Sequence, residues 1–229
     1  MRRVLFAILA AGLCAAQPTR SLVTFTHVKP DMLQEWLDIQ KLEVIPALKK
    51  AGVTRRTVVQ TVFGNVYEFV VVVPFEKYSE LEGHGPIPRL LAAKLRRCVT
   101  GERTFVNLSQ PDLAIPTDPK DPPQVMVSSV YRAAPGKRQE YLSFVRTELL
   151  PVYRKARIAG FLVSQRGFGS SANEIVLSTY YKQLADINSG PPLVQVLGRE
   201  AAGKIVAKSA DLATLVETVV RRRVNDLSF

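Results

Sequence analysis

Two histidines are the side chains of this chain best suited to acid–base chemistry or to binding a metal ion. His27 lies in the segment 23–28, which is rich in β-branched and aromatic residues and predicts a strand. It shares a strand face with Val23 and Phe25, so it could act as a general base or hold a ligand. A hydrogen-bonded strand histidine is the simpler interpretation. His84 lies between two glycines in the stretch 82–86, which either approaches a ligand closely or forms a turn.

Two glutamates each lie at or near the start of an apolar run that predicts a buried strand. Glu68 falls in the run 66–73, and Glu174 begins the run 174–181. Polar groups on core strands need partners. The two carboxylates could line a cavity or pair with Arg56 or Arg166, and structural pairing is the preferred interpretation.

The motifs of several enzyme classes are missing from the sequence. It has no nucleophile elbow, no phosphate-binding loop and no dinucleotide fingerprint. Its histidines and cysteines do not have the spacing of a zinc site. We therefore predict no metal site and no cofactor, and assign no catalytic residue.

The net charge of +11 makes the chain strongly basic. Such a surface attracts anions, including nucleic acid. However, the basic residues are scattered, and aromatic residues do not alternate with them as in a base-stacking platform. We predict a solvated basic surface and no nucleic-acid partner.

An internal repeat organises the chain. The sequence EVIPALKKA at 43–51 recurs as ELLPVYRKA at 148–156, an offset of 105 residues. At this offset Gln60 falls on Gln165 and His27 on Arg132, and one residue of slack places Glu68 on Glu174. Shared motifs in one order at a nearly constant offset indicate duplication. The two histidines, together with the polar residues that the repeat matches, are the candidate ligand-binding residues: His27, His84, Gln60, Glu68, Arg132, Gln165 and Glu174.

The first sixteen residues predict a secretory signal. A positive start at 2–3 precedes the apolar run 4–13 and small residues ahead of Gln17. The run is too short to span a bilayer. We predict cleavage after Ala16 and a periplasmic or secreted protein without a transmembrane segment; lipoprotein anchoring through Cys14 is the less favoured alternative. Cys98 then remains as the only cysteine, either a small buried hydrophobe or, between basic neighbours, a reactive thiol.

The spacing of apolar residues predicts the order β-α-β-β-α-β for each copy. The first has strands at 23–28, 57–63, 66–73 and 103–108, and helices at 31–51, kinked at Pro46, and 89–98. The second has strands at 125–131, 161–168 and 174–181, and a helix at 137–157. Helical stretches at 201–209 and 212–220 follow, with a last strand at 219–224 that could equally be helix.

We thus expect an α+β fold. The predicted divisions are a signal peptide at 1–16, a ferredoxin-like unit at 21–110, a proline-rich linker without helix or central strand at 111–124, and a second unit at 125–229.

The Pro-Gly-Lys turn at 135–137, the acidic and aromatic pair Glu140 and Tyr141, and the Leu150–Pro151 step resemble the dimeric α/β-barrel superfamily. Its NIPSNAP-like branch is the nearest, followed by antibiotic-biosynthesis-type monooxygenases. The resemblance implies two tandem ferredoxin-like units that form an intramolecular dimeric α/β barrel, as a monomeric pseudo-dimer or as a homodimer. It also implies a cavity for a small apolar or aromatic ligand, and its motifs specify fold better than activity.

Four functions remain open at this stage. The preferred one is an exported protein of unassigned activity that binds a small apolar or aromatic ligand. The alternatives are a cofactor-independent monooxygenase or isomerase, a haem-binding protein that uses His27 or His84, and a non-catalytic protein that interacts through exposed sheet edges. Whether the protein is an enzyme is left undecided.

Overall fold

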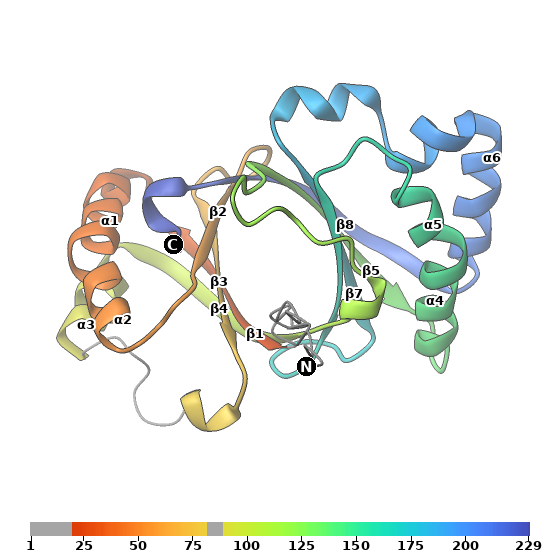
Figure 1. The fold of residues 1–229 in the computed structure, drawn as a ribbon. Helices are drawn as coiled ribbons and strands as arrows, with labels where there is room; N and C mark the ends of the chain where they lie inside the picture. The colour runs from red at the N-terminus through yellow and green to blue at the C-terminus, as the bar shows by residue number, and fades with distance from the viewer. Residues whose placement is uncertain (1–19, 82–88) are drawn as a thin grey trace, which may run out of the picture.

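A computed structural model describes residues 20–81 and 89–229 of the chain. Within this part, eight antiparallel strands close a barrel in the order β1-β3-β2-β8-β5-β7-β6-β4 (Figure 1). The strands are β1 (Arg20–Val28), β2 (Thr57–Thr61), β3 (Glu68–Phe75), β4 (Val99–Ser109), β5 (Val125–Ala133), β6 (Gly160–Arg166), β7 (Glu174–Tyr181) and β8 (Ala213–Arg223). The mixed α+β architecture with a closed barrel is the one expected from the sequence.

Two short seams join the four strands of one half to the four strands of the other. At the first seam, residues 59–61 of β2 pair with residues 221–223 of β8. At the second, residues 107–109 of β4 pair with residues 164–166 of β6. Each four-stranded sheet alone would expose two edges, and the seams remove them over these residues.

The helices lie outside the barrel on its two flanks (Figure 1). Those of the first half are α1 (Leu33–Ile39), α2 (Ile45–Lys50) and α3 (Arg89–Arg97), and those of the second half are α4 (Arg138–Phe144), α5 (Leu150–Tyr153) and α6 (Pro192–Ala210). Within the described residues, no helix is long and apolar enough to cross a membrane.

A π-helical segment precedes the same proline in each half. Gln40–Val44 joins α1 to α2, and Val145–Leu149 joins α4 to α5. The backbone N–H of Ile45 donates to the carbonyl of Gln40, five residues earlier, and the N–H of Leu150 donates likewise to Val145. The wider turn continues the helix into Pro46 and Pro151, whose rings would clash with a regular preceding turn. The helix therefore accommodates Pro46 without ending there.

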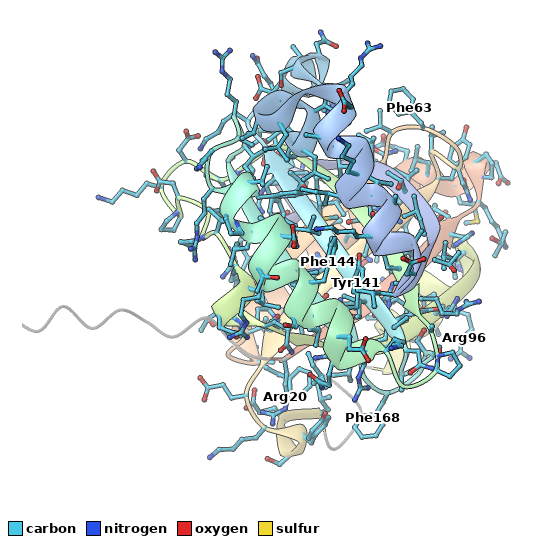
Figure 2. All side chains as sticks on the ribbon, turned by 90° about the vertical axis from the view of Figure 1, so that its right-hand side faces the viewer. Arg20, Phe63, Arg96, Tyr141, Phe144 and Phe168 are labelled. Carbon is cyan, nitrogen blue, oxygen red and sulfur yellow. The ribbon has the colours of Figure 1, made fainter. Side chains whose placement is uncertain are left out.

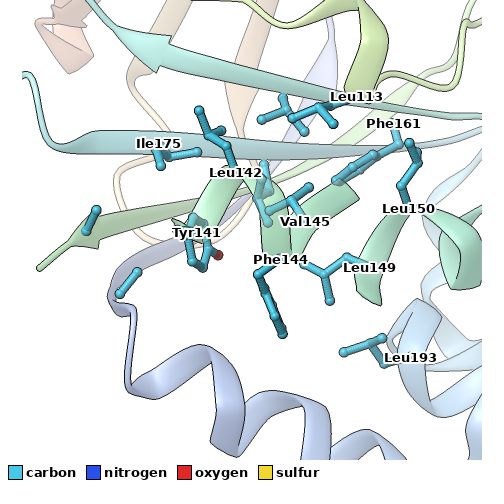
Figure 3. Packing of buried hydrophobic residues seen from close by; sticks show 14 of the residues in the cluster. Leu113, Tyr141, Leu142, Phe144, Val145, Leu149, Leu150, Phe161, Ile175 and Leu193 are labelled. Carbon is cyan, nitrogen blue, oxygen red and sulfur yellow. The ribbon is translucent and has the colours of Figure 1, made fainter. Parts of the chain in front are cut away.

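Each half buries a hydrophobic layer between its helices and its sheet. In the second half Tyr141, Val145 and Phe161 are at most 1% exposed, and Figure 3 shows side chains of α4 and α5 packed against the sheet. In the first half Trp36 takes the place of Tyr141 and is 1% exposed. The centroid of its ring lies 4.6 Å from that of the Phe69 ring. These layers fix the outer faces of the strands, so the alternate side chains point into the barrel.

Two expectations about the second half and the linker were wrong. The predicted helix at 212–220 is part of strand β8, and α6 ends before it at Ala210. Thr214, Val216 and Thr218 are β-branched, and β8 pairs with β5 along its length, so sheet pairing decides the conformation. The linker contains a short 3-10 turn, Pro111–Leu113, because a proline is well tolerated in a first helical turn. Leu113 is buried in the core of the second half.

Candidate functional site

The interior of the barrel holds a cavity of about 360 Å³. Strands β1 and β3 to β8 contribute its walls, because alternate residues of each strand point inward. Much of the surface is apolar. The apolar lining residues are Val23, Phe25, Val70, Val72, Phe105, Met126, Val130, Leu162, Val176 and Val216.

Two aromatic rings of the first half form part of this wall. Phe25 projects from β1 and Phe105 from β4, and their ring centroids are 5.2 Å apart. Phe105 is 3% exposed and packs with Val23 and Val70. The cavity therefore offers aromatic and branched aliphatic surface to a ligand.

Two buried arginines of the second half face these rings. Arg166 ends β6 and Arg221 lies near the end of β8, and they are 9% and 4% exposed. The Arg166 Cζ lies 3.6 Å from the centroid of the Phe105 ring, and the Arg221 Cζ lies 5.1 Å from that of Phe25. Such cation–π contacts stabilise a guanidinium group that is removed from water.

The seams bring each arginine opposite a small polar residue of the first half. Arg166 pairs with Asn107 across the β4–β6 seam, and Arg221 pairs with Thr61 across the β2–β8 seam. Arg166 Nη1 donates to Asn107 Oδ1 at 3.3 Å. Burial lowers the pKa of Arg166 to about 10, with Glu174 opposing the shift and Arg103 and Arg221 adding to it.

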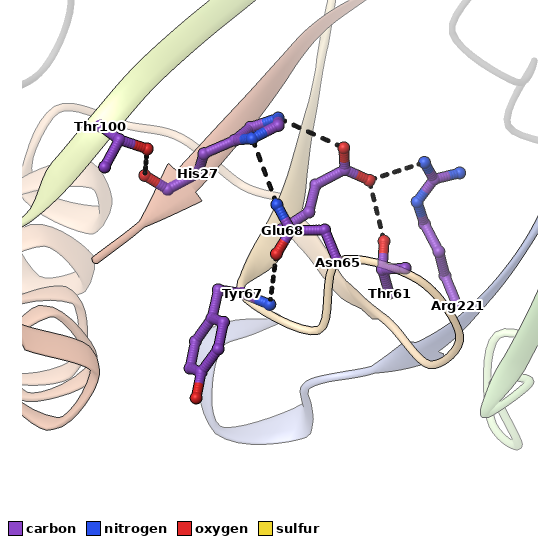
Figure 4. A network of polar contacts seen from close by, with 7 residues as sticks. All are labelled: His27, Thr61, Asn65, Tyr67, Glu68, Thr100 and Arg221. Carbon is purple, nitrogen blue, oxygen red and sulfur yellow. Dashed lines mark hydrogen bonds and ion pairs between the residues drawn. The ribbon is translucent and has the colours of Figure 1, made fainter. Parts of the chain in front are cut away.

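Glu68 is the centre of a polar network at one end of the barrel (Figure 4). Its Oε1 accepts hydrogen bonds from Thr61 Oγ1 at 2.8 Å and from Arg221 Nη2 at 2.9 Å. Its Oε2 lies 3.4 Å from His27 Nε2. Asn65 Nδ2 lies 3.3 Å from the other ring nitrogen, His27 Nδ1. A neutral imidazole that carries its proton on Nε2 satisfies both contacts.

His27 is not among the residues that line the cavity. Its two ring nitrogens contact Glu68 and Asn65, and its side chain is 45% exposed. His84 lies outside the described residues. Within the described residues, no cluster of histidine, cysteine and acidic side chains could hold a metal ion.

Glu174 occupies the equivalent place in the second half. It lies opposite Arg132 in the β5–β7 ladder, as Glu68 lies opposite His27 in the β1–β3 ladder. Its carboxylate accepts hydrogen bonds from Ser170 Oγ at 2.9 Å and Arg132 Nη2 at 3.2 Å, and Arg166 Nε is 3.8 Å away. Burial alone would raise the pKa of Glu174, but these hydrogen bonds and the nearby positive charges lower it below its ordinary value.

The structure separates the remaining candidates. Arg132 and Glu174 line the cavity, whereas Gln60 and Gln165 do not. Gln60 donates to the carbonyl of Val66 within its hairpin and borders a second cavity outside the barrel. Gln165 pairs with Ile175 one residue before Arg166, so it points to the opposite face of β6.

Cys98 is buried and its Sγ lies 3.6 Å from the carbonyl of Lys94. Burial and the charge of Glu35 raise the pKa of its thiol, which Arg97 and Lys29 only partly oppose. Of the two interpretations of Cys98, the structure supports the preferred one, a small buried hydrophobe, because removal from water outweighs the basic neighbours.

Sequence reasoning missed the two arginines as a pair that faces the cavity. Arg166 was considered only as a partner for a glutamate, and Arg221 belonged to a basic run at 221–223 interpreted as solvated surface. Strand alternation would have separated them: Arg221 is buried, and Arg222 is exposed on the outer face. The sequence leaves 219–224 open between strand and helix, and only a strand allows this alternation to be applied.

Solved structures share this fold at low sequence identity. A protein of Fusobacterium nucleatum provisionally described as a monooxygenase has a TM-score of 0.66 at 10% identity, over 92% of this chain and 94% of that chain. An anthrone oxidase-like protein has a TM-score of 0.62 at 12% identity, over 92% and 93%. A mutant chlorite dismutase from Candidatus Nitrospira defluvii has a TM-score of 0.54 at 9% identity, over 92% and 93%.

No protein-family model matches the chain, and no curated protein matches its sequence. The similarities above are therefore similarities of fold. They agree with an intramolecular dimeric α/β barrel built from two tandem units.

Proposed function

We propose that this chain is an exported protein that binds a small apolar or aromatic molecule inside its barrel. The observation that carries the proposal is the cavity of about 360 Å³, walled by Phe25, Phe105 and valines of several strands. This volume falls at the small end of the range for ligand sites, roughly 300–1,000 Å³. Such sites combine apolar walls with a few convergent polar groups, as this one does.

A neutral aromatic fluorophore, 1-aminoanthracene, tests the proposal directly. We expect its emission to rise and shift to the blue when it enters the barrel, with saturable binding. Val72→Phe places a ring in the cavity and should weaken binding at least about tenfold, because it removes the volume that the probe needs. Val206→Phe is the matched control, since Val206 is 57% exposed on α6. Equal binding by both variants would contradict a site in the barrel.

Export is part of the proposal and rests on the sequence of residues 1–16, which lie outside the described residues. Native mass spectrometry of protein recovered from the producing cell tests it. The mass of a chain that begins at Gln17 would support a cleaved secretory signal. The mass of a chain with a lipid-modified Cys14, or with Met1 retained, would contradict cleavage after Ala16. The same spectrum separates a monomer from a homodimer. The NIPSNAP-like branch likewise remains a proposal, supported by the Pro-Gly-Lys turn at 135–137 and the Leu150–Pro151 step.

A cofactor-independent oxygenase is the second candidate. The observation that favours it is the pair Arg166 and Arg221, since buried guanidinium groups can stabilise the oxyanion of an aromatic substrate. Anthrone is a suitable probe, because O₂ converts its CH₂ group to a ketone and releases one water. Formation of anthraquinone with equimolar O₂ consumption, lost in Val72→Phe, would support an enzyme. Binding of anthrone without turnover would contradict the oxygenase and leave ligand binding as the proposed function.

A further inference from the structure

We infer that the ligand of this barrel is an aromatic monoanion, such as a carboxylate, whose charged group is held between Arg166 and Arg221. The inference rests on the proposed function, because it specifies the ligand class of the same cavity. Both side chains line the cavity and both are at least nine-tenths buried. Their guanidinium groups lie by one ring, with Cζ 5.9 Å and 5.1 Å from the centroid of Phe25.

The hydrogen-bonding capacity of these arginines is not met by the protein. The Nε of Arg166 and the Nε of Arg221 are buried and have no hydrogen-bond partner among the described residues. Each guanidinium group carries five N–H donors. Arg166 donates to the neutral Asn107, and its Nε makes only a longer ion pair with Glu174, at 3.8 Å. Arg221 shares the carboxylate of Glu68 with Thr61. Buried donors without partners are unfavourable, and an anion beside the two guanidinium groups would offset this cost.

The charges that face the cavity are also unbalanced. Four arginines line it, Arg103, Arg132, Arg166 and Arg221, against two glutamates, Glu174 and Glu217. Glu68 neutralises part of this excess by binding Arg221 from the end of the barrel. One positive charge then remains, which is the charge that a carboxylate or a phenolate would neutralise. Because the guanidinium groups of Arg166 and Arg221 are themselves buried, this excess of positive charge attracts an anion to them.

The surroundings of the arginines define the rest of the ligand. The rings of Phe25 and Phe105 make cation–π contacts with the guanidinium groups. The apolar wall continues beside these rings through Val23, Val70 and Val72. An aromatic body can lie against this wall while its carboxylate accepts from both arginines. The volume of the cavity suits a body of no more than about three fused rings.

A pair of isosteric probes tests the inference on the unmodified protein. 2-Naphthoate and 2-naphthamide have nearly the same shape and differ in charge. We expect the wild-type protein to bind the naphthoate at least about tenfold more tightly than the amide in calorimetric titrations, since hydrogen bonds to charged groups are stronger than neutral ones. Equal dissociation constants for the two would overturn the inference and leave the proposed function intact. Binding of neither would overturn both.

Substitutions then locate the anion. Arg166→Gln and Arg221→Gln should each remove most of the preference for naphthoate while affinity for the amide changes little. Arg222→Gln is the matched control, because it removes a positive charge from the next position of β8 on the exposed outer face. A preference that persists in both cavity variants would overturn the inference. If either variant fails to fold, the wild-type comparison still decides.

Discussion

The guanidinium groups of Arg166 and Arg221 lie over the same aromatic ring, that of Phe25. The distances from Cζ to the ring centroid are 5.9 Å and 5.1 Å. Two like charges beside one ring are held by the surrounding strands, because Arg166 belongs to β6 and Arg221 to β8 at opposite edges of one four-stranded sheet. The ring of Phe25 therefore stabilises both charges at once.

This relationship predicts that Phe25→Leu destabilises the protein beyond the loss of apolar contact. The leucine keeps an aliphatic side chain in the cavity wall but removes the π face from two guanidinium groups. We expect the free energy of unfolding to fall by about 1–2 kcal/mol, measured in urea. Phe63→Leu is the control, since Phe63 is 64% exposed at a hairpin tip (Figure 2). A fall no larger in Phe25→Leu than in this control would contradict the stabilising role of the ring.

The lowered pKa of Glu174 predicts a loss of stability in acid. The folded protein stabilises the ionised form of Glu174 relative to the unfolded chain. The resulting contribution to the free energy of unfolding is present above the ordinary pKa of 4.5 and is lost as the pH falls below it. Glu174→Gln should therefore be less stable than wild type at pH 6, with the difference much reduced at pH 3. Unfolding in urea at the two pH values measures it. Glu200→Gln, an 87% exposed control, should differ little from wild type at either pH.

Two equivalent glycines should differ in their tolerance of alanine. Gly64 and Gly169 both have positive φ, +95° and +83°, at the tips of matching hairpins. A Cβ at Gly169 would lie 2.6 Å from the carbonyl oxygen of Thr104, whereas nothing lies within 4 Å of one at Gly64. Gly64→Ala should cost about 1 kcal/mol from its backbone conformation alone. Gly169→Ala should cost at least about 1 kcal/mol more, because it also pushes its hairpin off β4.

Chemical denaturation of the Gly64→Ala and Gly169→Ala variants measures this difference in the free energy of unfolding directly. Equal costs would show that the tip of the β6–β7 hairpin does not pack on β4.

The burial of Cys98 predicts an unreactive thiol. Its raised pKa and lack of exposed surface should make labelling by Ellman's reagent slow in the folded protein and complete in denaturant. Rapid, stoichiometric labelling of Cys98 in the folded protein would contradict this. The measurement also reports the number of cysteines in the mature chain, one if Cys14 has been removed.

The repeat revealed most of the fold because each copy carries its own periodic pattern. The offset of 105 residues correctly places Trp36 and Tyr141 at matching buried positions, as well as the two prolines that follow the π-helical segments. Strand β8 was the main failure. Its β-branched residues compete with a helical spacing, and only pairing with β5 and β2 decides between them.

The site was less predictable than the fold. Glu68 and Glu174 could be identified because they recur at the start of matching strands. The neighbours that matter to them could not, since Arg221 reaches Glu68 across a seam between residues 153 positions apart. A repeat describes what each copy contains, and the pairing of one copy with the other is set by the closure of the barrel.

The seams also show how the two copies have diverged. Arg166 has Thr61 as its counterpart in the first copy, and Arg221 has Asn107, so both buried arginines that line the cavity belong to the second copy. The rings of Phe25 and Phe105 belong to the first. A barrel made of two identical chains would have to place every substitution twice, once on each side of its symmetry axis. Fusion into one polypeptide lifts that constraint, so one copy can specialise in charge and the other in aromatic surface around a single asymmetric chamber.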